Sequence, residues 1–234
     1  MTHPRHVFLT GGTGYLGSRL AAELARRGHR VRALVRRGSE SKLPRDVTPI
    51  LGNALDETSF AEHVAPADTF VHLIGVAQPS PAKADQFRTV DLASAQAAVV
   101  AASAAAVRHF VYVSVAHPAP VMRAYWKTRQ EAEKLIAHSG LNATILRPWY
   151  VLGPRHRWPV LLLPLYWVAA LIPWTRHGAR RLGLVTLSQM VQALTYAVEH
   201  PIEGMRTVSV RKIRAGGVIE ATHRGLMDGT EGAS

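Results

Sequence analysis

Glycines at a regular spacing form the part of this sequence whose chemistry is easiest to infer. Gly11, Gly14 and Gly17 recur at every third position within Thr10-Gly11-Gly12-Thr13-Gly14-Tyr15-Leu16-Gly17. Glycine tolerates the unusual φ angles of a tight turn, and it places no Cβ between the backbone and a diphosphate. A helix that begins at such a turn adds free N–H groups and the positive end of its dipole. The stretch therefore predicts a phosphate-binding turn formed by Gly11, Thr13, Gly14, Tyr15, Leu16 and Gly17.

The elements around this turn make the glycine pattern more specific. An apolar run over 7–9 precedes it and is typical of a buried strand, whereas Leu16, Leu20 and Leu24 follow it at helical spacing. Strands are expected over 30–35, 47–51 and 109–113, a short helix over 60–64, a long helix over about 86–106, a loop over 147–154, and a capping box of Thr186 and Gln189 that opens a later helix. The alternation of strand and helix continues to about Ser114. Such alternation predicts an α/β fold, a doubly wound parallel sheet with helices on both faces. Ligands of such sheets bind at the carboxyl ends of the strands.

With these motifs the chain resembles the short-chain dehydrogenase/reductase superfamily, most closely its extended and atypical branches of epimerase-, dehydratase- and NmrA-like proteins. The resemblance covers roughly residues 5–212 and includes a second hallmark, Leu-Arg-Pro over 146–148 followed by Gly-Pro at 153–154. It implies a Rossmann domain over 1–214 that binds NAD(P), with substrate-binding elements within about 154–205. The Gly-rich remainder, 215–234, is expected to be a flexible tail.

Two arginines indicate which dinucleotide is bound. Arg36 and Arg37 follow an expected strand over 30–35. At this point of a Rossmann fold an acid selects NAD, whereas an arginine accommodates the 2′-phosphate of NADP. A guanidinium also forms paired hydrogen bonds with phosphate. We therefore expect NADP rather than NAD, although both arginines could merely cap a loop.

Further cofactor contacts are implied by the resemblance. Asn53 stands where relatives carry an acid that faces the adenine amine, and its carbonyl could accept the same bond. Asp91 stands where relatives often have Asn near the cofactor, and His72 is interpreted as a core histidine. The resemblance also places Ala54, Leu73, Ile74, Gly75, Pro148 and Val151 along the cofactor.

The resemblance implies three catalytic roles: a Tyr that exchanges a proton, a Lys four residues later, and a Ser that polarises the substrate. Tyr125 and Ser114 fit, and an i, i+4 pair shares a helix face. The fourth residue after the Tyr is Arg129, which offers charge but cannot relay a proton. Lys127 lies on another face. Tyr125, Ser114 and Arg129 are the predicted catalytic set; alternatively Tyr125 and Arg129 only hold the cofactor. His117 is a conceivable relay that nothing else in the sequence supports.

An uncharged apolar segment covers 160–174. It is shorter than the roughly 20 residues of a membrane span, and Pro164 interrupts it. It could line a substrate pocket, lie on a membrane surface between flanking arginines, or form a homodimer interface or core. The first two alternatives favour an apolar substrate, such as a lipid-like, isoprenoid, quinone or aromatic carbonyl compound, over a sugar nucleotide.

Composition limits the class of partner. The net charge of +12 favours anionic partners, but no basic run interleaved with aromatic residues indicates nucleic acid. The absence of cysteine excludes disulfides, thiolate catalysis and Cys-ligated metals, and no metal site is predicted. No secretory signal precedes the first expected strand. We therefore expect a cytoplasmic protein, with membrane association through 160–174 as an alternative.

Together these observations favour an NADP-dependent oxidoreductase of the atypical short-chain type that acts on an apolar carbonyl compound. One alternative is a non-catalytic NADP(H)-binding redox sensor or accessory subunit. A further alternative is an epimerase or dehydratase.

Overall fold

A computed structural model describes residues 3–119, 121–153 and 183–216. The apolar segment 160–174 and nearly all of the expected tail lie outside the described residues. Within those residues, every helix is too short or too polar to span a bilayer.

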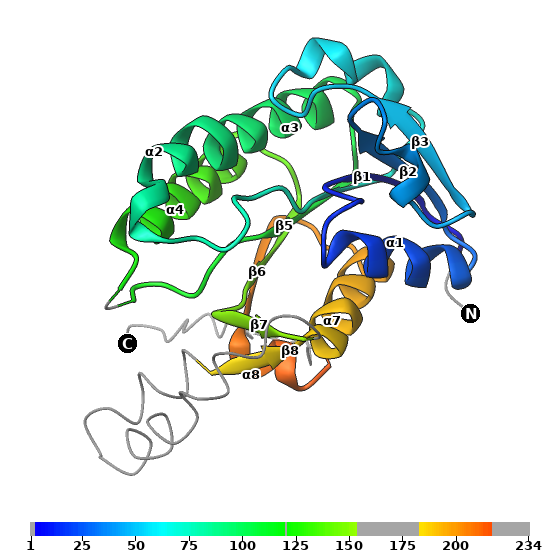
Figure 1. Ribbon diagram of the computed structural model, residues 1–234. Helices are drawn as coiled ribbons and strands as arrows, with labels where there is room; N and C mark the ends of the chain where they lie inside the picture. The colour runs from blue at the N-terminus through cyan, green and yellow to red at the C-terminus, as the bar shows by residue number, and fades with distance from the viewer. Residues whose placement is uncertain (1–2, 120, 154–182, 217–234) are drawn as a thin grey trace, which may run out of the picture.

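A parallel sheet forms the centre of the fold (Figure 1). Its strands are β1 (His6–Thr10), β2 (Arg30–Val35), β3 (Val47–Leu51), β4 (Thr69–His72), β5 (His109–Val113), β6 (Ala143–Arg147) and β9 (Met205–Ser209). Their order is β3-β2-β1-β4-β5-β6-β9, and all neighbours are parallel. The order runs outward from β1 in both directions, so the predicted doubly wound α/β fold is confirmed. The switch point, where such sheets bind ligands, lies between β1 and β4.

Helices cover both faces of the sheet (Figure 1). One face carries α1 (Gly17–Arg26), α7 (Leu187–Glu199) and the short α8 (Val210–Arg214), and the other carries α3 (Ala93–Ala104) and α4 (Arg123–His138). Side chains alternate between the faces along each strand. Within β1, for example, Val7 and Leu9 pack in the core between the sheet and α1 and α7, whereas Phe8 packs in the core between the sheet and α3 and α4.

The segment before α3 differs from the single long helix expected over 86–106. A three-residue helix, α2 (Ala84–Gln86), leads into a π-helical segment (Phe87–Leu92) before α3 begins. The extra residue per turn changes which side chains face the sheet. Asp91, in the π-helical segment, is thereby buried.

Other local expectations were also imprecise. The helix expected over 60–64 is a pair of 3₁₀ turns, Glu57–Ser59 and Ala61–His63. A small second sheet pairs β7 (Tyr150–Leu152), expected to be loop, with β8 (Leu184–Thr186). In contrast, the capping box expected at the start of α7 is confirmed, because Thr186 and Gln189 exchange side-chain hydrogen bonds at 3.2 and 2.9 Å.

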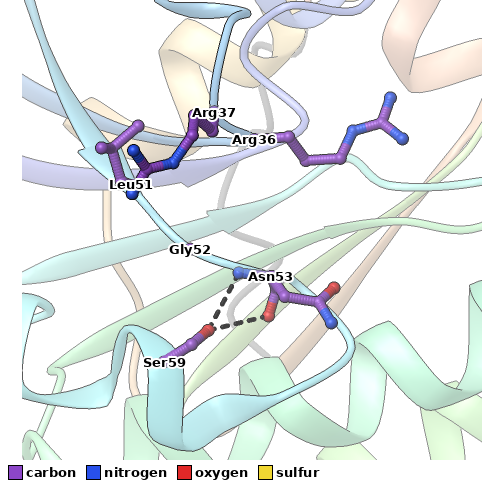
Figure 2. Close-up of a pocket in the computed structure, with 6 residues that line it drawn as sticks. All are labelled: Arg36, Arg37, Leu51, Gly52, Asn53 and Ser59. Carbon is purple, nitrogen blue, oxygen red and sulfur yellow. Dashed lines mark hydrogen bonds between the residues drawn. The ribbon is translucent and has the colours of Figure 1, made fainter.

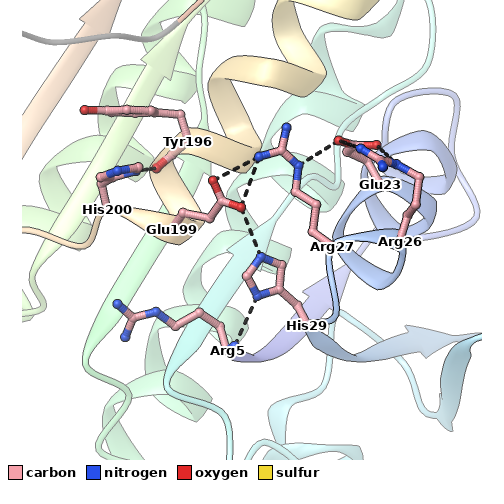
Figure 3. A network of polar contacts seen from close by, with 8 residues as sticks. All are labelled: Arg5, Glu23, Arg26, Arg27, His29, Tyr196, Glu199 and His200. Carbon is pink, nitrogen blue, oxygen red and sulfur yellow. Dashed lines mark hydrogen bonds and ion pairs between the residues drawn. The ribbon is translucent and has the colours of Figure 1, made fainter. Parts of the chain in front are cut away.

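A polar network joins the carboxyl ends of α1 and α7 (Figure 3). Arg27 Nη1 lies 3.1 Å from both oxygens of Glu199, and Arg27 Nε lies 2.7 Å from Glu23. His29 Nε2 lies 3.4 Å from Glu199, and its Nδ1 accepts the N–H of Arg5 at 3.1 Å. This network fixes the far end of the helix that begins at the glycine turn.

Candidate active site

The glycine turn connects the end of β1 at Thr10 to the start of α1 at Gly17. Gly11 has a φ of +80°, and its carbonyl accepts the N–H of Gly14 at 3.0 Å. A Cβ on Gly17 would stand 2.1 Å from the Gly11 oxygen, and one on Gly11 would stand 3.0 Å from the Leu73 carbonyl carbon. Glycine is therefore required for the first turn of α1 to pack against the loop. This backbone cradle at a helix N-terminus fits a diphosphate.

A pocket of about 580 Å³ lies beyond the ends of β2 and β3 (Figure 2). It is lined by Arg36, Arg37, Leu51, Gly52, Asn53 and Ser59. Both arginines are exposed, and no carboxylate lines the pocket with them. The structure therefore brings three predicted residues, Arg36, Arg37 and Asn53, to one place.

Hydrogen bonds fix the loop on the other side of this pocket. Asn53 Oδ1 accepts the N–H of Leu55 at 3.1 Å, and Ser59 Oγ accepts the N–H of Asn53 at 2.9 Å. Ser59 was not among the predicted residues. The sequence gives no indication that Ser59 lies near Asn53, because only the 3₁₀ turns bring the two residues together.

Arg129 occupies the other end of the site and points into the protein. Its Nη1 lies 3.1 Å from the Val113 carbonyl, 3.2 Å from the Tyr112 hydroxyl and 3.3 Å from the Ile74 carbonyl. Its Nη2 forms an ion pair with Asp91 at 3.1 Å. Burial raises the pKa of Asp91, an effect that the charge of Arg129 opposes. The guanidinium thus ties the π-helical segment to the ends of β4 and β5.

Gly75 makes this arrangement possible, since a Cβ there would stand 2.0 Å from Arg129 Nη2. Tyr125 is half-buried on the same face of α4. Its ring centroid lies 5.4 Å from Arg129 Cζ and 5.0 Å from the ring centroid of Phe87. The cation therefore faces the ring of Tyr125. Tyr125, Arg129 and Gly75 form one cluster.

Ser114 follows β5 and is 3% exposed. Its backbone N–H bonds to the Leu146 carbonyl at 2.8 Å, but its Oγ has no hydrogen-bond partner among the described residues. A buried hydroxyl without a partner costs about 1–3 kcal/mol. An oxygen atom of a bound ligand would remove that penalty.

His72 is fully buried in the core, in agreement with its interpretation from sequence. Its Nδ1 lies 2.8 Å from Thr10 Oγ1. Burial, followed by the charge of Arg129, lowers the pKa of His72 to about 3. It is therefore neutral at physiological pH and holds the ends of β1 and β4 together.

The remaining predicted residues surround these groups. The Tyr15 hydroxyl lies against Gly153, the residue after β7, where a Cβ would collide with it. Pro148 accepts the N–H of Ala116 at 2.8 Å. Leu73, Val151 and Leu16 pack on the core beside α1, and Ala54 packs on the core beside α3. No described contact places a side chain of Thr13 or Ile74 in either end of the site.

A buried polar cluster beside Ser114 was missed from sequence. His117 Nε2 lies 3.3 and 3.4 Å from the two oxygens of Glu133. Arg147 donates to the same carboxylate through Nε at 2.9 Å and through Nη2. The three residues are 14 to 30 positions apart along the chain, so only the packing of α4 against β6 brings them together.

Comparisons with known proteins agree with this geometry. A family model for NAD(P)H-binding proteins matches residues 11–157. The ceramide reductase of Caulobacter vibrioides is 31% identical over 150 residues, 63% of this chain and 47% of that protein. The 4-hydroxy-2-methyl-3-oxo-4-farnesyl-3,4-dihydroquinoline-1-oxide ketoreductase of Stigmatella aurantiaca is 27% identical over 169 residues, 63% of this chain and 50% of that protein. The matches thus span about half the length of these two relatives.

Solved structures resemble the chain over more of its length. The Bordetella bronchiseptica enzyme WbmH in complex with NAD⁺ has a TM-score of 0.67 and 22% identity, covering 88% of this chain and 76% of that one. The UDP-glucuronic acid 4-epimerase of Bacillus cereus in complex with NAD has a TM-score of 0.65 and 16% identity, covering 87% and 77%. At these identities the likeness establishes the fold.

Proposed function

Because the chain belongs to the NAD(P)H-binding family, within the extended and atypical branches of the short-chain dehydrogenase/reductase superfamily, we propose that it is an NADP-dependent reductase of an apolar carbonyl compound. The observation that carries the proposal is the buried, unpartnered hydroxyl of Ser114 at the carboxyl end of β5. A hydroxyl there can donate to a substrate oxygen.

The residues present fit NADP at two points. The cradle of Gly11 and Gly17 would hold the diphosphate, and Arg36 and Arg37 would hold the 2′-phosphate. When bound, the reduced nicotinamide supplies a hydride. Asn53 lies in the same pocket as the arginines. Its Oδ1 already accepts one bond but retains a second lone pair for the adenine amine.

An apolar substrate is supported by the relatives and by the sequence. The two relatives above are named for reducing ceramide and a farnesylated quinoline, both with long apolar groups. The segment 160–174 is uncharged, and Tyr166, Trp167 and Trp174 carry its only hydrogen-bonding side chains. A lipid-like or isoprenoid ketone therefore fits better than a sugar nucleotide.

A non-catalytic NADP(H)-binding protein is the second candidate, and one observation favours it. Arg129 replaces the expected lysine, and its two terminal nitrogens contact Asp91 and strand-end carbonyls. It cannot pass a proton to Tyr125, because a guanidinium does not lose its proton in proteins.

The test is to incubate the protein with NADPH and a panel of hydrophobic ketones and quinones, and to follow NADPH absorbance and product by mass spectrometry. We expect oxidation of NADPH with reduction of at least one apolar ketone, and none with a UDP-4-keto-hexose, a sugar nucleotide that carries a reducible carbonyl. If NADPH raises the melting temperature but no compound is reduced, the non-catalytic alternative holds. If neither NADPH nor NADH changes the melting temperature, both candidates fail.

A further inference from the structure

We propose that His117 is the catalytic acid that gives a proton to the substrate oxygen, and that Glu133 is the residue that positions it. The inference rests on the proposed function, because it concerns the proton that accompanies carbonyl reduction. Neither the family resemblance nor the relatives assign a role to these two residues.

The location of His117 is the first reason. It lies three residues after Ser114, in the loop that leaves the carboxyl end of β5. The preceding residue, Ala116, donates its N–H to Pro148 at 2.8 Å, which fixes this loop beside the one that follows β6. The His117 ring stacks on Trp126, at a centroid distance of 6.2 Å and an interplanar angle of 18°. Trp126 follows Tyr125 in α4, so His117 packs on the helix that carries Tyr125 and lies in the loop that begins at Ser114.

The way the ring is held is the second reason. The His117 side chain is 8% exposed and that of Glu133 is 6% exposed. A carboxylate only accepts hydrogen bonds, so His117 Nε2 must donate to Glu133, which leaves Nδ1 as the working nitrogen. Nδ1 has no hydrogen bond within the part of the chain that the structure describes, and it is not sealed from solvent. A histidine whose second nitrogen is fixed by a carboxylate is a recurrent acid–base arrangement.

Arg147 completes the cluster by binding both oxygens of Glu133. The fork holds the carboxylate in one orientation. Glu133 on α4 contacts the His117 imidazole directly. Arg147 on β6 contacts Glu133 and affects the imidazole through that carboxylate. The cluster is built to orient one imidazole.

The reaction balances with this residue as acid. As the hydride adds to the carbonyl carbon, the C–O π bond breaks and its electron pair moves to the oxygen. That oxygen takes the proton from Nδ1 of the protonated imidazole. His117 is left neutral, with its remaining proton on Nε2 facing Glu133, and it regains a proton from water. Ser114 and Tyr125 donate hydrogen bonds to the same oxygen, so no proton has to pass through Arg129.

The test compares His117→Gln with His138→Gln, an exposed histidine near the end of α4. Glutamine keeps a donor for Glu133 but cannot exchange a proton. We expect His117→Gln to lower kcat by about 10²-fold or more, with NADPH affinity and KM unchanged. It should also remove the alkaline limb of the pH–rate profile, the limb that loss of the proton from His117 would cause. Tyr125→Phe should lower kcat but keep that limb, and His138→Gln should behave as wild type.

Nitrogen-15 NMR of the cofactor-free protein provides a readout that does not depend on turnover. His117 should show the tautomer protonated at Nε2, and Glu133→Gln should reduce its population. An Nδ1-protonated tautomer in the wild type would overturn the positioning role. Wild-type kcat and pH profile in His117→Gln would overturn the catalytic role alone, whereas a wild-type protein that reduces no compound would overturn the proposed function as well.

Discussion

The guanidinium of Arg129 lies 3.1 Å from the carboxylate of Asp91, and the two side chains are 7% and 1% exposed. The pair bridges α4 and the π-helical segment before α3, directly against the backbone of Gly75. Arg129, which replaces the expected lysine, therefore holds α4, the π-helical segment and the loop at Gly75 together. Its removal should affect stability before chemistry.

Replacing Arg129 with methionine should destabilise the protein by about 3–5 kcal/mol, because Asp91 would be left buried and unpaired. Urea denaturation measures this free energy of unfolding. The double replacement with Asp91→Leu should recover part of the loss, since no isolated charge remains. Additive losses in the double variant would show that the two side chains do not interact.

Removing the positive charge of Arg36 and Arg37 should reduce affinity for NADPH selectively. The Arg36→Ala, Arg37→Ala double variant should bind NADPH about 10-fold to 100-fold more weakly, as expected for lost charge-assisted hydrogen bonds, and should bind NADH as before. Dissociation constants from nucleotide fluorescence measure both. Arg45→Ala, an exposed arginine outside the pocket, is the matched control. An equal loss for both dinucleotides would contradict the assignment to the 2′-phosphate.

The network between α1 and α7 should contribute to stability through Glu199, whose side chain is 7% exposed and contacts Arg27 and His29. Glu199→Gln should lower the free energy of unfolding by about 1–3 kcal/mol, since it weakens hydrogen bonds to a charged group. Glu203→Gln, an exposed glutamate just beyond α7, should have little effect. Equal unfolding midpoints for the two variants in urea would argue against the network.

His72 should make the protein less stable in acid. Its pKa is about 3 in the fold against 6.5 for an ordinary histidine, so the unfolded chain binds the proton more readily. The stability that it contributes is fully present above pH 6.5 and is lost as the pH falls toward 3. By linkage the loss is about 2 kcal/mol at pH 5.

The measurement compares unfolding in urea at pH 7 and pH 5. Between these values the free energy of unfolding of His72→Gln should fall by about 2 kcal/mol less than that of the wild type. His109, whose pKa burial lowers to about 4, remains in both proteins, so some acid sensitivity persists. His138→Gln should show the wild-type change in the free energy of unfolding between the two pH values. If His72→Gln shows that same change, His72 does not cause the loss of stability in acid.

Local patterns in the sequence were sufficient for most of the framework. The strands expected over 30–35, 47–51 and 109–113 were confirmed residue for residue, because short segments rich in β-branched and apolar residues favour strands. The capping box at Thr186 was confirmed because it depends only on two residues three positions apart, Thr186 and Gln189. By contrast, β7 pairs with a strand more than thirty residues later, and no local pattern reports such a partner.

The geometry of the candidate site could be predicted from the sequence where it depends on the backbone, and less so where it depends on side-chain contacts. The turn at Gly11 depends on glycine spacing, which is visible in the sequence. The orientation of Arg129 toward Asp91 depends on the π-helical segment, which arises from tertiary packing. His117 and Glu133 meet only because α4 packs against the end of β6, so the sequence alone offered no reason to pair them.

The pocket at the ends of β2 and β3 comes from a single stretch of chain, residues 36–59. The residues to which we assign the chemistry, Ser114, His117 and Tyr125, come from elsewhere, between residues 72 and 148. In the proposed function, cofactor choice and chemistry are therefore encoded in separate parts of the sequence. Transplanting that one stretch from a homologue that prefers NADH should switch the nucleotide while leaving the reaction and its substrate as they were.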